Sequence, residues 1–135
     1  MKEEEKENLF ITFQCTIESI IADKRKNPKY EKLINDYEAK INIGLQIDED
    51  VYLWLNLKAE KGNYALNRGK IDEYDLKVKV TPEDLLFFSN GENSILNMMM
   101  KKNQFGFRKL RFSRGSSGKR NLGKLLKLSK IIVLD

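Results

Sequence analysis

The spacing of apolar residues changes from a helical to an extended period near residue 38. Phe10, Phe13 and Ile17 recur every three or four positions, which is the period of an amphipathic helix. Residues 41–47 and 51–57 instead carry an aliphatic side chain at every second position, which is the period of a strand with one buried face. The chain is therefore expected to begin with helices and to continue into a sheet, and the short acidic turn between the two alternating runs predicts a hairpin.

Turn and cap signals divide the rest of the chain into further elements. Asn27-Pro28 and Thr81-Pro82 each open a helix, and Asn90-Gly91 ends one. The predicted helices cover residues 3–24, 28–37, 83–90, 95–100 and 121–130, and the predicted strands cover residues 41–47, 51–57, 64–66, 76–80 and 106–113. Because tight turns demand antiparallel pairing and the helices collect toward the chain ends, the predicted class is α+β: a single five-stranded antiparallel sheet with helices covering one face.

The length of the chain fits one compact unit. Residues 1–135 are expected to form a single domain in which residues 1–37 are N-terminal helices. The longest apolar runs fall well below the ~20 residues needed to cross a bilayer. The acidic start at residues 1–5 lacks the apolar stretch of a signal peptide. We therefore expect a cytoplasmic protein without a transmembrane helix.

The residue types that most often carry catalysis are scarce. The chain has no histidine, and its one cysteine, Cys15, lies in an apolar helical stretch. The commonest general base and the commonest metal ligand are thus missing, and the usual zinc sets of Cys and His are excluded. We expect a buried Cys15 thiol, no cofactor, no metal site and no enzymatic activity.

Basic residues are concentrated at the C-terminal end. Residues 101–135 hold eleven of the 25 Lys and Arg residues but only one of the 20 acidic residues. A basic surface on a mildly acidic body predicts an anionic partner, either phospholipid headgroups or nucleic acid. Within it, residues 115–119 read Gly-Ser-Ser-Gly-Lys, which has the wrong spacing for a nucleotide-binding P-loop. Lys119 and Arg120 could still hold a lipid phosphate, with a plain solvated turn as the alternative.

The second half of the chain carries more apolar surface than a tight core under five strands needs. Met98-Met99-Met100 cannot lie on one side of a helix, and methionine adapts to apolar guests of variable shape. Phe87-Phe88 and the leucines of the last helix add to this surface. A ligand cavity is one interpretation and simple core filling is the other.

Residues 38–131 resemble the sterol carrier protein 2 family in the order of their elements and in several local signatures. The shared signatures include an extended pair with an aromatic such as Trp54, the turn Lys61-Gly62, the capped helix start Thr81-Pro82-Glu83-Asp84-Leu85-Leu86, the apolar helix of residues 95–100, and the strand Lys109-Leu110-Arg111-Phe112 followed by Gly115. The resemblance implies a sterol-carrier-like core over residues 38–131. It also implies a hydrophobic tunnel for lipids, fatty acyl chains or sterols, with the last helix as one wall.

From this resemblance we predict a non-catalytic protein that binds, and in some form transfers, a lipid-like ligand. The predicted ligand-binding residues are Phe87, Phe88, Ile95, Met98, Met99, Leu122, Leu125 and Leu126. Lys119, Arg120 and Lys124 are predicted to contact a lipid headgroup or an anionic membrane surface. The last residues of the sequence do not match a peroxisomal targeting signal, so a peroxisomal location is not expected.

Two alternatives to lipid binding follow from the residues themselves. The first is a nucleic-acid-binding module, because Arg108, Arg111 and Arg114 are interleaved with Phe105 and Phe107. This alternative is less favoured because Phe112 alternates into the core and the last helix carries leucines. The second is an interaction module that forms a homodimer through the sheet face bearing Tyr52 and Trp54.

Overall fold

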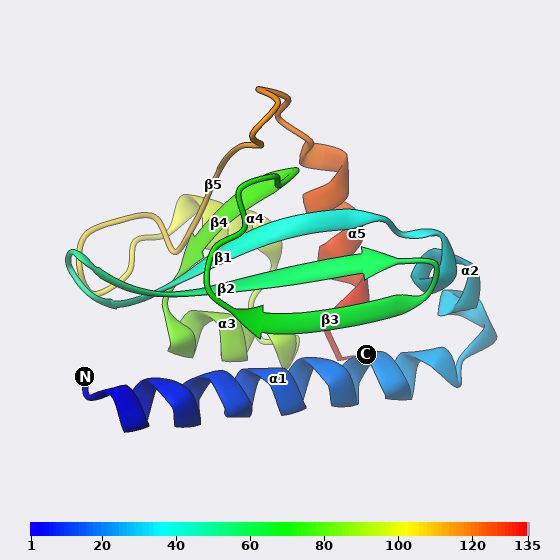
Figure 1. Ribbon diagram of the computed structural model, residues 1–135, viewed down its shortest axis with the longest axis horizontal. Helices are drawn as coiled ribbons and strands as arrows, with labels where there is room; N and C mark the ends of the chain where they lie inside the picture. The colour runs from blue at the N-terminus through cyan, green and yellow to red at the C-terminus, as the bar shows by residue number, and fades with distance from the viewer. Residues whose placement is uncertain (135) are drawn as a thin grey trace.

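The computed structural model describes residues 1–134 and contains five helices and five strands in these residues (Figure 1). The helices are α1 (Glu3–Arg25), α2 (Pro28–Asp36), α3 (Pro82–Ser89), α4 (Ile95–Met100) and α5 (Leu122–Ile131). The strands are β1 (Ala39–Asp48), β2 (Val51–Glu60), β3 (Asn63–Arg68), β4 (Leu76–Val80) and β5 (Leu110–Arg114). The predicted order of elements is confirmed.

Three of the helices begin at side-chain caps that the sequence contains. The side chain of Asn27 accepts a hydrogen bond from the backbone N–H of Lys29 at the start of α2. The side chains of Thr81 and Ser94 do the same at the starts of α3 and α4. Each cap satisfies one of the backbone donors that a helix start leaves unpaired. These caps fix where the two short helices of the second half begin, and so which of their residues face the sheet.

The five strands form one sheet in the order β3-β2-β1-β4-β5. The predicted α+β class with a five-stranded sheet is confirmed, but the sheet is not wholly antiparallel, because β1 and β4 run parallel. The prediction extended the rule for tight turns to every pair, although tight turns join only β1 to β2 and β2 to β3. Residues 69–75 instead carry the chain from the β3 edge to the far side of β1, where β4 enters in the direction of β1.

This crossing segment lies on the face of the sheet that bears Asn42 and Asn56, which we call the outer face. The side chain of Asn42 donates to the carbonyl oxygen of Ile71 at 2.9 Å and accepts from its N–H at 3.0 Å. Asn56 donates to the carbonyl oxygen of Gly69 at 2.9 Å. These bonds explain why two asparagines on an outer face are almost fully buried.

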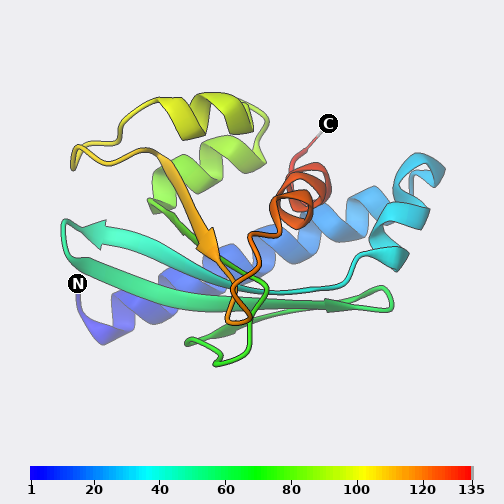
Figure 2. The ribbon, with the colours of Figure 1, turned by 90° about the horizontal axis from the view of Figure 1, so that it is seen from above.

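The opposite face, which we call the inner face, supports the hydrophobic core. Ile41, Leu45 and Leu55 point from it toward the helices and are almost fully buried. Helices α3, α4 and α5 lie over this face, and α1 runs along the β3 edge (Figures 1 and 2). In α1 the predicted apolar stripe is buried, whereas Cys15 lies off the stripe and is exposed, so the prediction of a buried thiol is wrong.

Among residues 1–134, no helix is both long and apolar enough to cross a membrane. The longest helix, α1, carries many charged side chains and buries only one face against the rest of the protein. Arg68 of β3 holds the start of α1 through ion pairs with Glu3 at 2.5 Å and Glu7 at 2.8 Å. The hydrogen bond from Arg68 lowers the pKa of Glu3.

Two stacked tyrosines join α2 to the rest of the fold. The rings of Tyr37 and Tyr64 lie 6.4 Å apart and nearly parallel. The hydroxyl of Tyr37 donates to the carbonyl oxygen of Lys124 at 2.7 Å, and that of Tyr64 donates to the carbonyl oxygen of Ile34 at 2.9 Å. Burial raises the pKa of Tyr64 from 10.0 to about 12 and raises the pKa of Tyr37 as well.

Alkaline pH is therefore expected to destabilise the fold. The unfolded chain releases the two phenol protons near pH 10, whereas the folded chain keeps them to higher pH. This contribution to stability is complete below pH 10 and is lost as pH rises through the raised pKa values of the folded state. Urea unfolding followed by circular dichroism across this range measures the loss. In the variants Tyr37→Phe and Tyr64→Phe the free energy of unfolding should fall less steeply as pH rises. An unchanged pH dependence in both variants would contradict the role given to the two phenols.

Candidate functional site

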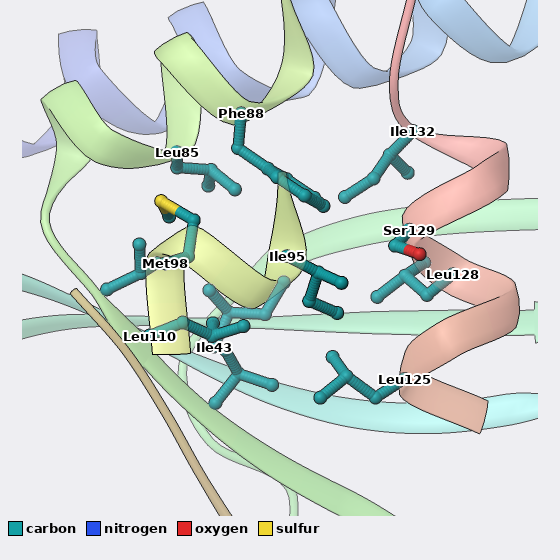
Figure 3. A pocket seen from close by; sticks show the side chains of 12 residues that line it. Ile43, Leu85, Phe88, Ile95, Met98, Leu110, Leu125, Leu128, Ser129 and Ile132 are labelled. Atoms are coloured by element: carbon teal, nitrogen blue, oxygen red, sulfur yellow. The ribbon is translucent and has the colours of Figure 1, made fainter. Parts of the chain in front are cut away.

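The inner face of the sheet and three helices enclose an apolar cavity of about 40 Å³ (Figure 3). Its walls come from β1, β4, β5, α3, α4, α5 and the residue after α5. The lining side chains are Ile43, Val78, Val80, Leu85, Phe88, Ile95, Met98, Leu110, Leu125, Leu128, Ser129 and Ile132. Eleven of these twelve side chains are hydrocarbon or thioether, so the cavity suits an apolar guest and repels a charged one.

The local sequence explains how each helix directs its residues at the cavity. The Thr81 cap starts α3 so that Leu85 and Phe88, three positions apart, share the face toward the sheet. The Ser94 cap starts α4 so that Ile95 and Met98 do the same. The strands supply the floor through side chains at alternate positions, as Val78 and Val80 show.

A second apolar cavity of about 20 Å³ adjoins the first on the side of α1. Phe13 and Ile17 of α1 line it together with residues of β2 and β3. Four residues line both cavities: Ile43, Leu85, Leu128 and Ile132. The two cavities therefore adjoin each other between the sheet and its helices, and we call them together the inner seam.

The inner seam is much smaller than a pocket for a lipid. Pockets for small organic ligands usually measure about 300–1,000 Å³, and an engineered cavity of about 150 Å³ holds benzene. The larger cavity here measures about 40 Å³. An acyl chain would fit only if side chains or helices moved apart.

The packing of the helices suggests one place for such a movement. Helix α5 contacts α1 and α2 more extensively than it contacts α3 or α4. Leu125 and Leu128 of α5 face Ile95 of α4 and Phe88 of α3 across the cavity (Figure 3). Helix α5 is therefore held more firmly to α1 and α2 than to α3 and α4, and its boundary with α3 and α4 is a candidate for movement.

The structure brings half of the predicted ligand-binding residues to the cavity. Phe88, Ile95, Met98 and Leu125 line it. Met99 packs against the core next to it without lining it. Phe87, Leu122 and Leu126 are 42–43% exposed and point away from the cavity lining.

Sequence reasoning missed the other lining residues, although signals for most of them exist. Ile43, Val78 and Val80 occupy inward positions of alternating strands and were identified only as core. Leu128 lies three positions after Leu125, so the helical period alone would have found it. Ile132 follows the end of α5, where no period applies.

The predicted headgroup residues lie in different settings. Lys119 and Arg120 are exposed in the segment before α5. Lys124 forms an ion pair with Asp75 at 3.4 Å and donates to the carbonyl oxygen of Glu38 at 2.7 Å. Lys119 and Arg120 are therefore better placed than Lys124 to meet a phosphate without breaking an existing contact.

The cavity contains little polar chemistry. Ser129 is its one hydroxyl-bearing residue, and this hydroxyl donates to the carbonyl oxygen of Leu126 at 2.6 Å. In the part of the chain that the structure describes, no three His, Cys, Asp or Glu side chains gather in a way that could hold a metal ion. The lining is chemically suited to an apolar molecule and offers no charged partner inside.

No family model matches this sequence, and no curated protein matches it at a significant level. Solved structures match the fold. The sterol carrier protein domain 2 of Helicoverpa armigera has a TM-score of 0.60 at 13% identity, covering 84% of this chain and 82% of that one. Sterol carrier protein 2 from Yarrowia lipolytica has a TM-score of 0.56 at 15% identity, covering 84% of each chain.

A third match extends the likeness to a bacterial protein. A conserved hypothetical protein of Thermus thermophilus, described as possibly a sterol carrier protein, has a TM-score of 0.53 at 12% identity, covering 88% of this chain and 85% of that one. Identities this low establish the fold alone. The predicted resemblance to sterol carrier protein 2 is confirmed at that level.

Proposed function

Since this chain has the sterol carrier protein 2 fold, we propose that it is a non-catalytic protein that binds one lipid-like ligand in the inner seam. The ligand is a fatty acyl chain or another slender apolar molecule. The observation that carries the proposal is the apolar cavity between the sheet and helices α3, α4 and α5, with the second cavity directly beside it.

Binding requires the seam to widen into a tunnel. Burial of an acyl chain contributes about 0.8 kcal/mol per CH₂ group, so a long chain supplies enough free energy to separate loosely packed helices. We place this separation at the wall between α5 and the pair α3 and α4, because α5 makes its larger contacts with α1 and α2. Leu125 and Leu128 then line one side of the ligand, and Phe88, Ile95 and Met98 line the other.

Exposed apolar residues of the three covering helices fit the same proposal. Phe87, Leu96, Met100 and Leu122 are large apolar side chains with 43–62% of their surface exposed, and they belong to α3, α4 and α5. Side chains of this kind beside an opening would keep an acyl chain out of water as it enters. Together with Lys119 and Arg120 they also suit transient contact with an anionic membrane, where each basic residue contributes about 1 kcal/mol.

The test is uptake of a fluorescent fatty acid by delipidated protein. A polyene fatty acid such as cis-parinaric acid should gain fluorescence and saturate at one molecule per chain, because the two adjoining cavities share four lining residues and are proposed as one site. The bound ligand should also raise the free energy of unfolding, by about 2.7 kcal/mol at a free concentration one hundred times the dissociation constant.

Two controls make this test decisive. Circular dichroism must show that the delipidated protein is folded, and a charged dye without an acyl chain should not bind. A folded protein that takes up no fatty acid, and whose stability the fatty acid leaves unchanged, would contradict the proposal.

A further inference from the structure

The outer face of the sheet carries a row of residues that lies outside the inner seam and brings Arg111, from the basic C-terminal end, beside residues of three other strands. Trp54 of β2 pairs with Gly44 of β1, Gly44 pairs with Lys79 of β4, and Lys79 pairs with Arg111 of β5. These four residues therefore form one line across four strands, which we call the cross-strand row. With strands about 4.8 Å apart, the row is about 14 Å long.

At one end of the row the indole ring of Trp54 lies flat on the sheet. A Cβ atom at Gly44 would lie 2.9–3.2 Å from three atoms of this ring, so only glycine lets the indole rest on the backbone. The Nζ atom of Lys70 sits 4.2 Å from the ring centroid, and Lys70 is exposed. The outward face of the indole is thus covered by one long side chain, which a planar ligand can displace.

At the other end, aromatic rings and cations alternate. The Nζ atom of Lys79 lies 5.0 Å from the ring centroid of Tyr52, and the guanidinium of Arg111 lies 4.5 Å from that of Phe107. Arg111 also donates to the side-chain oxygen of Gln46 at 2.8 Å and to the hydroxyl of Tyr52 at 3.2 Å. These neutral contacts orient the guanidinium and leave its charge uncompensated.

The cations of this surface have no carboxylate partner. Within residues 1–134, the ion pairs involve Arg68, Lys109 and Lys124, and neither Lys70, Lys79 nor Arg111 forms one. Unpaired cations at this density attract a polyanion. The surface therefore combines a flat aromatic face with free positive charge.

We propose that the cross-strand row binds a short stretch of single-stranded nucleic acid, with a base stacked on Trp54 and backbone phosphates on Lys79 and Arg111. Aromatic stacking combined with cations that track the phosphates is the general chemistry of such binding. The acidic turn at residues 48–50 is exposed at the end of the same hairpin, so the nucleic acid runs across the strands rather than along them.

This occupant fits the geometry better than a membrane or an acidic peptide does. A membrane-binding aromatic inserts its ring between lipids, whereas the ring of Trp54 lies flat against Gly44 and cannot project. An acidic peptide would use the cations but would leave the flat face of the indole without a planar partner. The row also lies on the face of the sheet opposite to the lipid-binding seam, so the two proposals stand independently.

Trp54 is the only tryptophan of the chain, so its fluorescence reports directly on the proposed contact. Adding oligothymidylate or oligouridylate at low salt should quench this fluorescence, because a stacked base covers the indole. The logarithm of the association constant should fall linearly with the logarithm of the salt concentration. For two phosphate contacts the expected slope is about −1.4. Comparing the affinities for the two oligonucleotides shows whether the row prefers DNA or RNA.

Variants distinguish the row from a general effect of positive charge. In fluorescence anisotropy with labelled oligonucleotide, Trp54→Ala should weaken binding by about five- to a hundredfold, and Lys79→Gln should weaken it while leaving the fold intact. The matched control is Lys77→Gln, because Lys77 lies on the same strand and face but pairs with Asn42 outside the row. Lys77→Gln should bind as the unaltered protein does.

Three results would overturn the proposal. They are the absence of quenching in the folded protein at low salt, equal weakening by Lys79→Gln and Lys77→Gln, and equal quenching by anionic phospholipid vesicles or polyglutamate. Quenching that is specific to oligonucleotides and sensitive to Lys79 would establish it.

Discussion

Replacing Met98 with alanine is expected to lower the free energy of unfolding by about 2–5 kcal/mol. Met98 is only 1% exposed and lines the larger cavity from α4. Its removal enlarges a space that is already incompletely filled, so the loss of transfer free energy is joined by the loss of contacts along the new cavity surface. Urea unfolding followed by circular dichroism measures the difference.

Met100 provides the matched control for Met98. It belongs to the same short helix but is 61% exposed, so Met100→Ala should change stability by no more than about 0.5 kcal/mol. Fatty acid should also restore more stability to Met98→Ala than to Met100→Ala, because the ligand fills the enlarged space. Equal destabilisation by the two variants would show that α4 does not pack against the sheet as described.

Replacing Leu128 with tryptophan is expected to weaken fatty acid binding by tenfold or more. Leu128 lines both cavities of the inner seam, so a larger side chain at this position occupies the route that an acyl chain must take. Overpacking of this kind costs about 1–3 kcal/mol, and each ~1.4 kcal/mol that opposes the bound state weakens binding about tenfold. Titration with cis-parinaric acid measures the change.

Leu126 serves as the control because it lies on the same helix and is 42% exposed. Leu126→Trp adds the same side chain outside the seam and should leave fatty acid affinity within about twofold of the unaltered protein, since a surface change is worth about 0.5 kcal/mol or less. If Leu126→Trp blocked uptake and Leu128→Trp did not, the ligand would bind on the outside of α5 instead.

The local features of the fold could be predicted because each depends on a few neighbouring residues. The change of apolar period separated α1 from the strands, and the side chains of Asn27 and Thr81 marked helix starts that the structure shows. The parallel pairing of β1 with β4 could not be predicted in this way. It depends on the path of residues 69–75 over the outer face, which is held by hydrogen bonds to Asn42 and Asn56 from distant parts of the chain.

Part of the candidate site could be predicted because helix caps also depend on a few neighbouring residues. Phe88, Ile95 and Met98, which were predicted as ligand-binding residues, lie together at the cavity because the caps of α3 and α4 fix which residues face inward. In α5 the leucines at 122, 125 and 126 were treated as one face, whereas the buried positions are Leu125, Leu128 and Ile131. Which stripe of a helix faces the core depends on how the helix docks, and here the hydrogen bond from Tyr37 to the carbonyl oxygen of Lys124 helps to set that docking.

On the outer face, the sequence alone could not predict which residues of neighbouring strands lie side by side. The alternation of β2 places Tyr52 and Trp54 on one face, and the sequence shows this directly. That Trp54 lies opposite Gly44, and Gly44 beside Lys79, follows only from the register of three strands. A single residue shift in either pairing would separate the ring from the cation.

The most direct test of the account is to locate a bound fatty acid by nuclear magnetic resonance. With a ¹³C-labelled fatty acid and methyl-labelled protein, intermolecular nuclear Overhauser effects should join the acyl chain to methyl groups of Ile43, Leu125 and Leu128, which line the larger cavity. Contacts confined to the exposed side chains Leu96 and Met100, with none to these three residues, would show that the ligand stays on the surface and that the inner seam is ordinary core.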